Sequence, residues 1–260
     1  MTVENPTDLR FSEYETRLTR AGVEPNFFVS ERYWQAAGWA AKSLDGGTTL
    51  HVLDQEGQEM LPPMDPDGPR PAEVWCDFVG YQGLGQAEFL DHQFLYLPSS
   101  FLDLSGHQRA VFRRNVRRFD KRNPNWTYRQ PRSQDELMGV MGDWLEDGQE
   151  VYDLDAIVRY METCPAAESR VLGVDGEVVA ANAWDYNRTF INFRYSFVRR
   201  GVKYLSEFVR LQFYLDMMDR WPGRFVNDGG SLGSDRLFRF KSKLGPWRVD
   251  QLHTWRKETE

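Results

Sequence analysis

Residues 196–208, SFVRRGVKYLSEF, decide how the second half of this chain is interpreted. The stretch begins as the end of an apolar strand, passes through Arg199, Arg200 and Gly201, and continues into an apolar helix. Two adjacent cations and a glycine at a strand-to-helix turn stand out because the whole chain carries a net charge of −7. The elements on either side of the turn indicate what it serves.

The flanking residues predict an ordered series of strands and helices. Upstream, three antiparallel strands are expected at 169–174, 177–186 and 189–198, with turns at Asp175-Gly176 and Asn187-Arg188. Downstream, we expect a helix from 204 to Pro222-Gly223, a strand at 224–228, a glycine-rich loop, a helix at 234–244 and a strand at 248–257. This order predicts an α/β fold with a mixed, largely antiparallel central sheet and flanking helices.

A cationic helix is predicted before these strands. Ser105 and Gln108 have capping-box spacing at its expected start, and Asn123-Pro124 ends it. Its narrow apolar stripe contains Phe112, Val116 and Phe119. Its cations form two columns at four-residue spacing: Arg113, Arg117 and Lys121 in one, and Arg114, Arg118 and Arg122 in the other.

The positive charge is concentrated in this segment. From His107 to Arg132 there are nine Lys or Arg residues against one acid, a local charge of +8, so the rest of the chain carries −15. Like charges on one helix repel, which favours a polyanion-binding site over a solvated face without function. The alternative is that the acidic, helical stretch at 135–162 neutralises the basic helix inside the fold. A second basic cluster, with the same two readings, contains Arg236, Arg239, Lys241 and Lys243.

The first 94 residues carry weaker signals. The first 40 residues are expected to be helical, because the stretch at 31–44 places Tyr33, Trp34, Ala37 and Ala41 at three- and four-residue intervals. Strands at 48–54 and 58–63 are expected to form a hairpin around Glu56-Gly57. Residues 61–71 are rich in proline and predict a loop. Further strands are expected at 72–81 and 94–99, around a glycine-rich stretch at 80–85 that matches no phosphate-binding pattern and predicts an ordinary turn.

Composition limits the class of protein. With 41% apolar and 14% aromatic residues, the 260-residue chain can bury a substantial core. Cys76 and Cys164 have no paired Cys or His spacing, so neither a zinc site nor a disulfide framework is supported. No stretch approaches 18 continuous apolar residues, and the N-terminus does not resemble a targeting peptide, so we expect a cytoplasmic protein without a membrane span. Its oligomeric state is not readable.

The predicted order of elements resembles the core of the GNAT N-acyltransferase superfamily. In that family the turn after the central strand binds the pyrophosphate of coenzyme A with backbone N–H groups at a helix N-terminus. Arg199, Arg200 and Gly201 resemble part of the family's signature there, whereas Tyr204 stands at a position that is normally small. The resemblance implies that backbone N–H groups near Phe197 and Val198 polarise the donor carbonyl. It further implies that the donor phosphates are held by Arg199, Arg200, Gly201 and Lys203.

One branch of the superfamily is more similar. The C-terminal domain of phosphatidylglycerol lysyltransferases and the Fem-type peptidyltransferases carry a basic helix like LSGHQRAVFRRNVRRFDKRNP and a C-terminal run like VNDGGSLGSDRLFRFKSKLGP. The resemblance covers about residues 95–258. It implies a GNAT-like domain at 95–260, with residues 1–94 a possible degenerate first half. Members of the branch typically use aminoacyl-tRNA as donor, which implies that nucleic acid binds Arg113, Arg114, Arg117, Arg118, Lys121 and Arg122.

Acyl transfer to an amine needs an oriented carbonyl, a deprotonated amine and a stabilised oxyanion, but no nucleophilic side chain. No Ser-His-Asp or Cys-His arrangement is evident among the four histidines. Asn227 and Asp228 end a strand where the central strands should separate, so Asp228 is the candidate base, although Asn-Asp-Gly-Gly is also good turn chemistry. Tyr195 and Tyr204 are candidate acids for the leaving group, or packed aromatic residues.

We therefore expect an N-acyltransferase that moves an acyl or aminoacyl group from acetyl-CoA or aminoacyl-tRNA onto an amine by direct attack, with no tightly bound cofactor. One alternative is that the acceptor amine belongs to a modified nucleic-acid base, which would make the reaction a DNA or RNA modification. Another is a non-catalytic nucleic-acid-binding module that keeps the fold.

Overall fold

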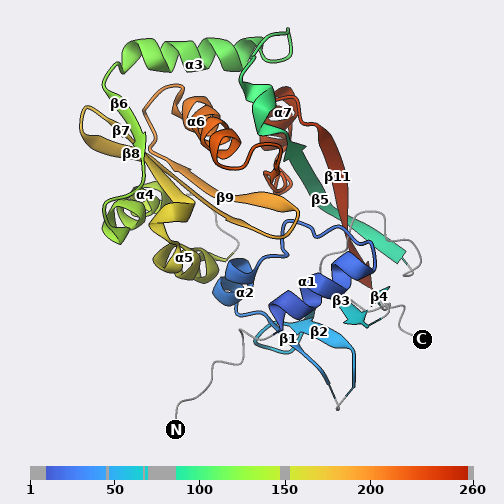
Figure 1. The fold of residues 1–260 in the computed structure, drawn as a ribbon. Coiled ribbons are helices and arrows are strands. Elements are labelled where there is room, and N and C mark those ends of the chain that lie inside the picture. The colour runs from blue at the N-terminus through green and yellow to red at the C-terminus, as the bar shows by residue number, and fades with distance from the viewer. Residues whose placement is uncertain (1–9, 45–46, 67, 70–85, 147–152, 257–260) are drawn as a thin grey trace. The chain divides into compact units, whose positions relative to one another are not determined.

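The computed structural model describes residues 10–44, 47–66, 68–69, 86–146 and 153–256 (Figure 1). The chain divides into two compact units. The first contains Met1–Gln93, Asn187–Thr189 and Val249–Glu260, and the second contains Phe94–Tyr186 and Phe190–Arg248. Whether residues 1–94 are a degenerate acyltransferase-like half stays a prediction.

The first unit packs two helices against a small sheet. Helices α1 (Phe11–Arg20) and α2 (Glu31–Ala37) accompany strands β1 (Ala40–Lys42), β2 (Leu50–Leu53), β3 (Glu59–Asp65) and β4 (Gly68–Pro69), which lie in that order in the sheet. Its core is apolar and aromatic: Tyr14, Leu18, Trp34, Val52 and Leu61 are buried. The predicted hairpin is confirmed, because Asp54 N–H donates to Gln58 O at 3.0 Å across the turn.

Two predictions in this unit are wrong in part. The first 40 residues are not helical throughout: among those described, α1 ends at Arg20, and α2 ends at Ala37 because Gly38 adopts φ +74° as its C-cap and residues 40–42 then pair with β2. The loop expected over 61–71 begins later, since β3 continues to Asp65 and pairs with both β2 and β4. The strand predicted at 72–81, the glycine-rich stretch at 80–85 and Cys76 lie outside the described residues.

The second unit is built on most of a seven-stranded sheet. Its order is β11 (Arg248–Arg256), β5 (Gln86–Tyr96), β10 (Phe225–Asn227), β9 (Phe190–Val198), β8 (Glu177–Tyr186), β7 (Ser169–Val174) and β6 (Trp126–Arg129). Strands β6 to β9 pair antiparallel, whereas β10 pairs parallel with β9 and antiparallel with β5. The predicted mixed, largely antiparallel sheet is confirmed.

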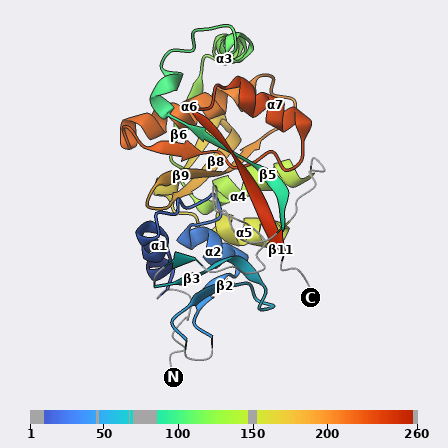
Figure 2. The ribbon, with the colours of Figure 1, turned by 90° about the vertical axis from the view of Figure 1, so that its right-hand side faces the viewer.

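Helices cover both faces of this sheet. Figures 1 and 2 show α6 (Leu205–Arg220), with α3 (Ala110–Arg122) outside it, on one face, and α4 (Gln134–Glu146) and α5 (Leu154–Thr163) on the other. Short 3-10 turns at Pro98–Phe101 and Ala166–Glu168 and helix α7 (Asp235–Lys243) complete the unit. Its core includes the ring stack of Phe193 on Phe213, with centroids 3.9 Å apart.

A β-bulge in the central strand β9 redirects its side chains. The register with β8 shifts between Ala183, opposite Tyr195, and Trp184, opposite Phe193, so Arg194 is the additional residue. Before the bulge, Phe193 packs on α6. After it, Tyr195 packs on Tyr160 of α5 although it is two residues further along the strand. The bulge therefore transfers the odd-numbered side chains of β9 from one face of the sheet to the other.

The predicted N-cap of the basic helix, Ser105, is wrong by four residues. Helix α3 begins at Ala110 with Arg109 as an N-cap that makes no side-chain cap bond. Ser105 lies outside the helix, where its N–H donates to Asp103 Oδ1 at 2.8 Å, and Gln108 donates instead to Ser242 O at 2.9 Å. The capping-box residues are therefore occupied by a local turn and by a contact to the end of α7.

Candidate functional site

Strands β9 and β10 separate at the centre of the second unit. They pair in parallel only over 190–192 and 225–227. Beyond Asn227 the chain follows β5 instead: Asp228 N–H donates to Phe94 O at 2.9 Å, and Phe94 N–H to Gly229 O at 3.2 Å. Strand β9 continues to Val198, so its last residues have no β10 neighbour. The separation predicted beside Asn227 and Asp228 is thus present.

Of the two predicted carbonyl-polarising groups, Val198 faces this opening. Arg199 N–H donates to Val179 O of β8 at 2.9 Å. Because backbone groups alternate along an antiparallel strand, Phe197 N–H also points to β8, opposite Ala181. The N–H of Val198 points the other way, toward the side that β10 has left. An acyl oxygen placed in the opening can accept a hydrogen bond from Val198 N–H.

The turn after β9 contains cations with different surroundings. The Arg199 guanidinium is ion-paired with Glu177 at 2.6 Å and with Asp143 at 2.8 Å, and these hydrogen bonds raise the pKa of Arg199 above its ordinary value. Arg200 and Lys203 are exposed, and Gly201 has φ +85°. Among the predicted phosphate ligands, Arg199 is therefore already occupied by carboxylates, whereas Lys203 extends into solvent.

Helix α3 presents a dense cationic surface. Phe112, Val116 and Phe119 are buried, as the apolar stripe predicts, and Arg113 is half-buried and donates to the carbonyl oxygens of Leu104 and Gly106. The exposed cations are Arg114, Arg117, Arg118, Lys121 and Arg122. A groove of about 400 Å³ is lined by Ala110, Arg113, Arg114, Arg117, Arg118 and Lys121.

The acidic helices α4 and α5, as far as the structure describes them, do not neutralise this surface. Within the described ranges, none of the five exposed cations of α3 is ion-paired with a carboxylate. Helices α4 and α5 lie on the other face of the sheet, and Glu136 of α4 pairs instead with Arg129 of β6 at 2.8 Å (Figure 1). The described residues of the acidic stretch, 135–146 and 153–162, therefore do not neutralise the basic helix, which was the alternative that the sequence left open.

The basic helix and the turn after β9 meet at Tyr204. Its ring lies 5.6 Å from Arg118 Cζ and 5.2 Å from Arg122 Cζ, and Arg118 Nη1 donates to its hydroxyl at 3.4 Å. Phe119 stacks on Phe208 of α6 with centroids 4.3 Å apart. Two cationic features separated by about 80 residues in the sequence thus form one surface.

Asp228 lies in a buried ion cluster. Its Oδ2 accepts from Tyr214 at 2.8 Å and from Arg210 Nη1, and Lys241 Nζ lies 3.3 Å from its Oδ1. Lys241 also donates to the carbonyl oxygens of Asp228 and Gly230. The side chains of Asp228, Arg210 and Lys241 are 3%, 10% and 6% exposed. The surface or phosphate-binding reading of Lys241 is therefore wrong, because the Asp228 loop holds it inside the fold.

Several solved structures resemble this one, although no protein-family model and no curated protein matches the sequence. A conserved protein of unknown function from Bacteroides thetaiotaomicron has a TM-score of 0.70 at 14% identity, covering 95% of this chain and 97% of that one. L-PGS from Bacillus licheniformis has a TM-score of 0.65 at 16% identity, covering 99% of this chain and 95% of that one. The C-terminal domain of a putative lysylphosphatidylglycerol synthetase from Agrobacterium fabrum has a TM-score of 0.61 at 16% identity, covering 94% of this chain and 92% of that one.

Two further matches extend the comparison. FemX has a TM-score of 0.56 at 9% identity, and a tandem GNAT protein from the clavulanic acid biosynthesis pathway has 0.51 at 10%. The fold is GNAT-like. The resemblance inferred from the order of elements and from the branch-specific segments is thereby confirmed for the fold.

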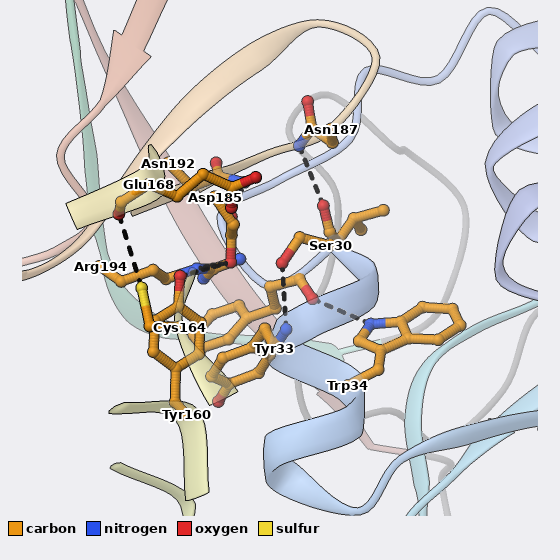
Figure 3. Close-up of polar contacts among 12 residues, drawn as sticks. Ser30, Tyr33, Trp34, Tyr160, Cys164, Glu168, Asp185, Asn187, Asn192 and Arg194 are labelled. Atoms are coloured by element: carbon orange, nitrogen blue, oxygen red, sulfur yellow. Dashed lines mark hydrogen bonds and ion pairs between the residues drawn. The ribbon is translucent and has the colours of Figure 1, made fainter. Parts of the chain in front are cut away.

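The GNAT-like sheet carries a buried polar cluster on its α5 face that the sequence did not reveal. Figure 3 shows side chains converging on Asp185 of β8: Tyr160 at 3.2 Å, Asn192 at 2.9 Å and Arg194 at 2.7 Å. Asn192 is opposite Asn227 in the parallel pair of β9 and β10. Polar residues at alternate positions of a strand ordinarily predict a solvated face, so only the α5 covering shows that these are interior.

The remaining predicted residues have structural contacts of their own. Asn227 is buried, and its Oδ1 accepts from Gly229 N at 3.0 Å, which is the turn chemistry expected of it. The ring of Tyr195 packs on Tyr160 and Phe197, and burial raises the pKa of Tyr195 to about 12, so the phenol is protonated at neutral pH. A protonated phenol retains the ability to donate a proton, but its aromatic packing is what the structure shows.

No described helix combines the length and apolar character that crossing a bilayer requires. Among the described residues, no group of three or more His, Cys, Asp or Glu side chains is arranged to hold a metal ion.

Proposed function

We propose that this chain is an N-acyltransferase that moves an acyl or aminoacyl group from a CoA thioester or an aminoacyl-tRNA onto an amine. The observation that carries the proposal is the opening between β9 and β10, with Val198 N–H facing it and the cationic surface of α3 and Lys203 close to the end of the same strand. The similar folds of the C-terminal domain of a putative lysylphosphatidylglycerol synthetase and of a tandem GNAT protein support it.

The chemistry requires no covalent enzyme intermediate. The acceptor amine attacks the carbonyl carbon of the donor, and the oxygen of the tetrahedral intermediate accepts a hydrogen bond from Val198 N–H. The C–S or C–O bond to the donor then breaks, the amine loses a proton, and the thiolate or alkoxide leaving group gains one. Orientation of the two reactants in the opening supplies most of the remaining rate enhancement.

The proton-transfer residues are proposals with different support. Asp228 is next to the opening, but its carboxylate already accepts from Arg210 and Tyr214 and pairs with Lys241, so as a base it must compete with two cations. Tyr195 remains a candidate acid. The hydroxyl of Tyr204 is hydrogen-bonded to Arg118, which makes a role in holding the arginine the better-supported one.

The donor's phosphates match the charge of the surface. Coenzyme A and tRNA are both polyanions, and guanidinium groups form bidentate hydrogen bonds to phosphate. Four of the five exposed cations of α3 are arginines. We therefore propose that Arg114, Arg117, Arg118, Lys121 and Arg122, with Lys203 at the turn, bind the donor's phosphates.

A transfer assay tests the proposal. Radiolabelled acetyl-CoA and aminoacyl-tRNA are each supplied with a panel of primary amines and with DNA, and labelled amide is measured for the wild type and for Arg118→Ala/Arg122→Ala. We expect transfer from one donor, reduced at least tenfold in the variant at subsaturating donor because each phosphate contact adds to affinity. The matched control Arg236→Ala/Arg239→Ala removes two exposed arginines from α7 and is expected to retain activity.

A second function is favoured by one observation. Asp228 and Arg199, two residues assigned to catalysis and donor binding from sequence, are both held in ion pairs with other residues of the chain. That arrangement fits a nucleic-acid-binding module that keeps the fold without the reaction. Salt-sensitive polynucleotide binding, lost in Arg118→Ala/Arg122→Ala, together with no amide formed from either donor, would establish this function instead.

A further inference from the structure

Tyr204 occupies a position of the turn where the resemblance implies a small residue. Its backbone conformation is also unusual. It has φ +67° and ψ +10°, a left-handed conformation that L-residues other than glycine, Asn and Asp adopt rarely. It stands at the N-cap of α6, where Ser, Thr, Asp or Asn would satisfy a helix N–H, and it makes no side-chain cap bond. A strained aromatic residue without a capping role points to another use of its ring.

The ring of Tyr204 is placed between the apolar core and two cations. One side is packed against the core cluster of the second unit, and Arg118 and Arg122 lie over it at 5.6 and 5.2 Å. The two arginines are one helical turn apart on α3, are exposed, and have no carboxylate partner among the described residues. The ring therefore immobilises two guanidinium groups that would otherwise move freely in water.

Two fixed guanidinium groups at neighbouring positions have a natural ligand class. Without an acid to neutralise them, they attract an anion, and their planar forks match phosphate oxygens. Prior fixation reduces the side-chain entropy that binding would otherwise cost. A membrane surface fits less well, because Val111 is the only large exposed apolar side chain on α3.

We infer that Tyr204 is a positioning residue that fixes Arg118 and Arg122 as a two-guanidinium site for phosphate groups beside the donor turn. The inference rests on the proposed function, since it assigns a purpose to part of the proposed donor surface. The phosphate has two possible sources, the backbone of a nucleic acid or the phosphates of coenzyme A, and one experiment distinguishes them.

The experiment compares two substitutions that differ in the aromatic face. Tyr204→Phe keeps the ring and loses only the hydroxyl, whereas Tyr204→Leu keeps apolar burial and the same left-handed backbone but has no π surface. Equilibrium binding of a fluorescent single-stranded RNA, a tRNA and coenzyme A is measured at 50 and 200 mM salt, with melting temperature as a check on folding. Tyr186→Leu removes a comparable ring contact at Arg224, 5.6 Å away, and serves as the control.

We expect Tyr186→Leu to bind within about twofold of the wild type and Tyr204→Leu to lose about tenfold in affinity, because both arginines must then be ordered on binding. Tyr204→Phe should lose less than Tyr204→Leu, since it keeps the ring and loses only the 3.4 Å contact of the hydroxyl with Arg118. The loss should decrease at 200 mM salt. Loss for RNA alone assigns the site to a nucleic-acid backbone, and loss for coenzyme A alone assigns it to the nucleotide. Equal binding by Tyr204→Leu and the wild type, with Arg118→Ala/Arg122→Ala still impaired, overturns the inference and leaves the proposed function standing. Absence of binding by the wild-type protein overturns both.

Discussion

Replacing Asp228 by Asn separates its catalytic from its structural role. The substitution preserves side-chain size and one acceptor oxygen but removes the charge that faces Arg210 and Lys241, whose side chains are 10% and 6% exposed. Breaking a buried ion pair by removing one partner costs about 3–5 kcal/mol because the remaining charge is left uncompensated. Since Asn still accepts a hydrogen bond from Tyr214, we expect the lower limit, about 3 kcal/mol.

This value predicts a measurable shift in melting temperature. For a unit of this size, 1 kcal/mol corresponds to about 2–4 °C, so Asp228→Asn should melt about 6–12 °C below the wild type in differential scanning calorimetry. Asp219→Asn is the matched control, because Asp219 is an exposed residue of α6, and a change of less than about 0.5 kcal/mol is expected there. Combining Asp228→Asn with Arg210→Met should recover part of the loss, since one of the two uncompensated cations is then gone and only Lys241 remains.

A small shift would refute the reasoning. If Asp228→Asn melts within about 2 °C of the wild type, the ion cluster does not hold the loop after β10 in the way its contacts indicate. If the same variant also loses acyl transfer by about 10²-fold or more while still binding donor, the carboxylate is the base, as the sequence suggested.

Three further outcomes are expected. The hydrogen bond from Arg129 holds the pKa of Glu136 at about 2, below its unfolded value of 4.5. Glu136 therefore adds stability above pH 4.5 that is lost as the pH falls toward 2. In melting curves, the free energy of unfolding of the wild type should exceed that of Glu136→Gln by at most about 1 kcal/mol at pH 6 and equal it at pH 2. In donor-binding titrations, Lys203→Ala should weaken affinity several-fold. Arg199→Ala should leave the affinity within about twofold of the wild type, because carboxylates already neutralise Arg199. A larger loss for Arg199→Ala than for Lys203→Ala would contradict the assignment of the turn cations. Phe119→Ala should lower the free energy of unfolding in urea by about 3–5 kcal/mol, since this fully buried ring packs α3 on α6. The same variant should weaken polynucleotide binding. Unchanged binding would show that the position of α3 does not matter for binding.

The series of strands and helices from residue 169 onward could be predicted because its signals are local, whereas strand β6 (Trp126–Arg129) was not predicted. Asp175 and Gly176 have φ +52° and +88°, as the Asp-Gly hairpin turn demands, and α6 ends just before Pro222 and Gly223. Local signals failed where another part of the chain competed for the same groups. Ser105 has capping-box spacing, but a turn with Asp103 takes its N–H, and the end of α7 takes the Gln108 amide.

The candidate site was only partly visible in the sequence. Its cations could be counted and their periodicity read, but a charge acquires a role from its neighbours. Arg199 pairs with Asp143, 56 residues away, and Lys241 is buried against the Asp228 loop, so neither is available as a surface cation. Arg118 and Arg122 have the same residue type and the same local spacing as Arg114, yet only these two lie over the ring of Tyr204.

The sequence by itself determined the order of elements from residue 169 onward, the basic character of helix α3 and the turn at 199–204, because hydrophobic periodicity, turn residues and charge spacing act over a few residues. Only the tertiary structure decided that Arg194 forms a bulge in β9, that β10 leaves β9 after Asn227, and that Tyr204 meets an arginine 86 residues away. These outcomes depend on which distant segments pack together, and a linear pattern of residue types does not specify that packing.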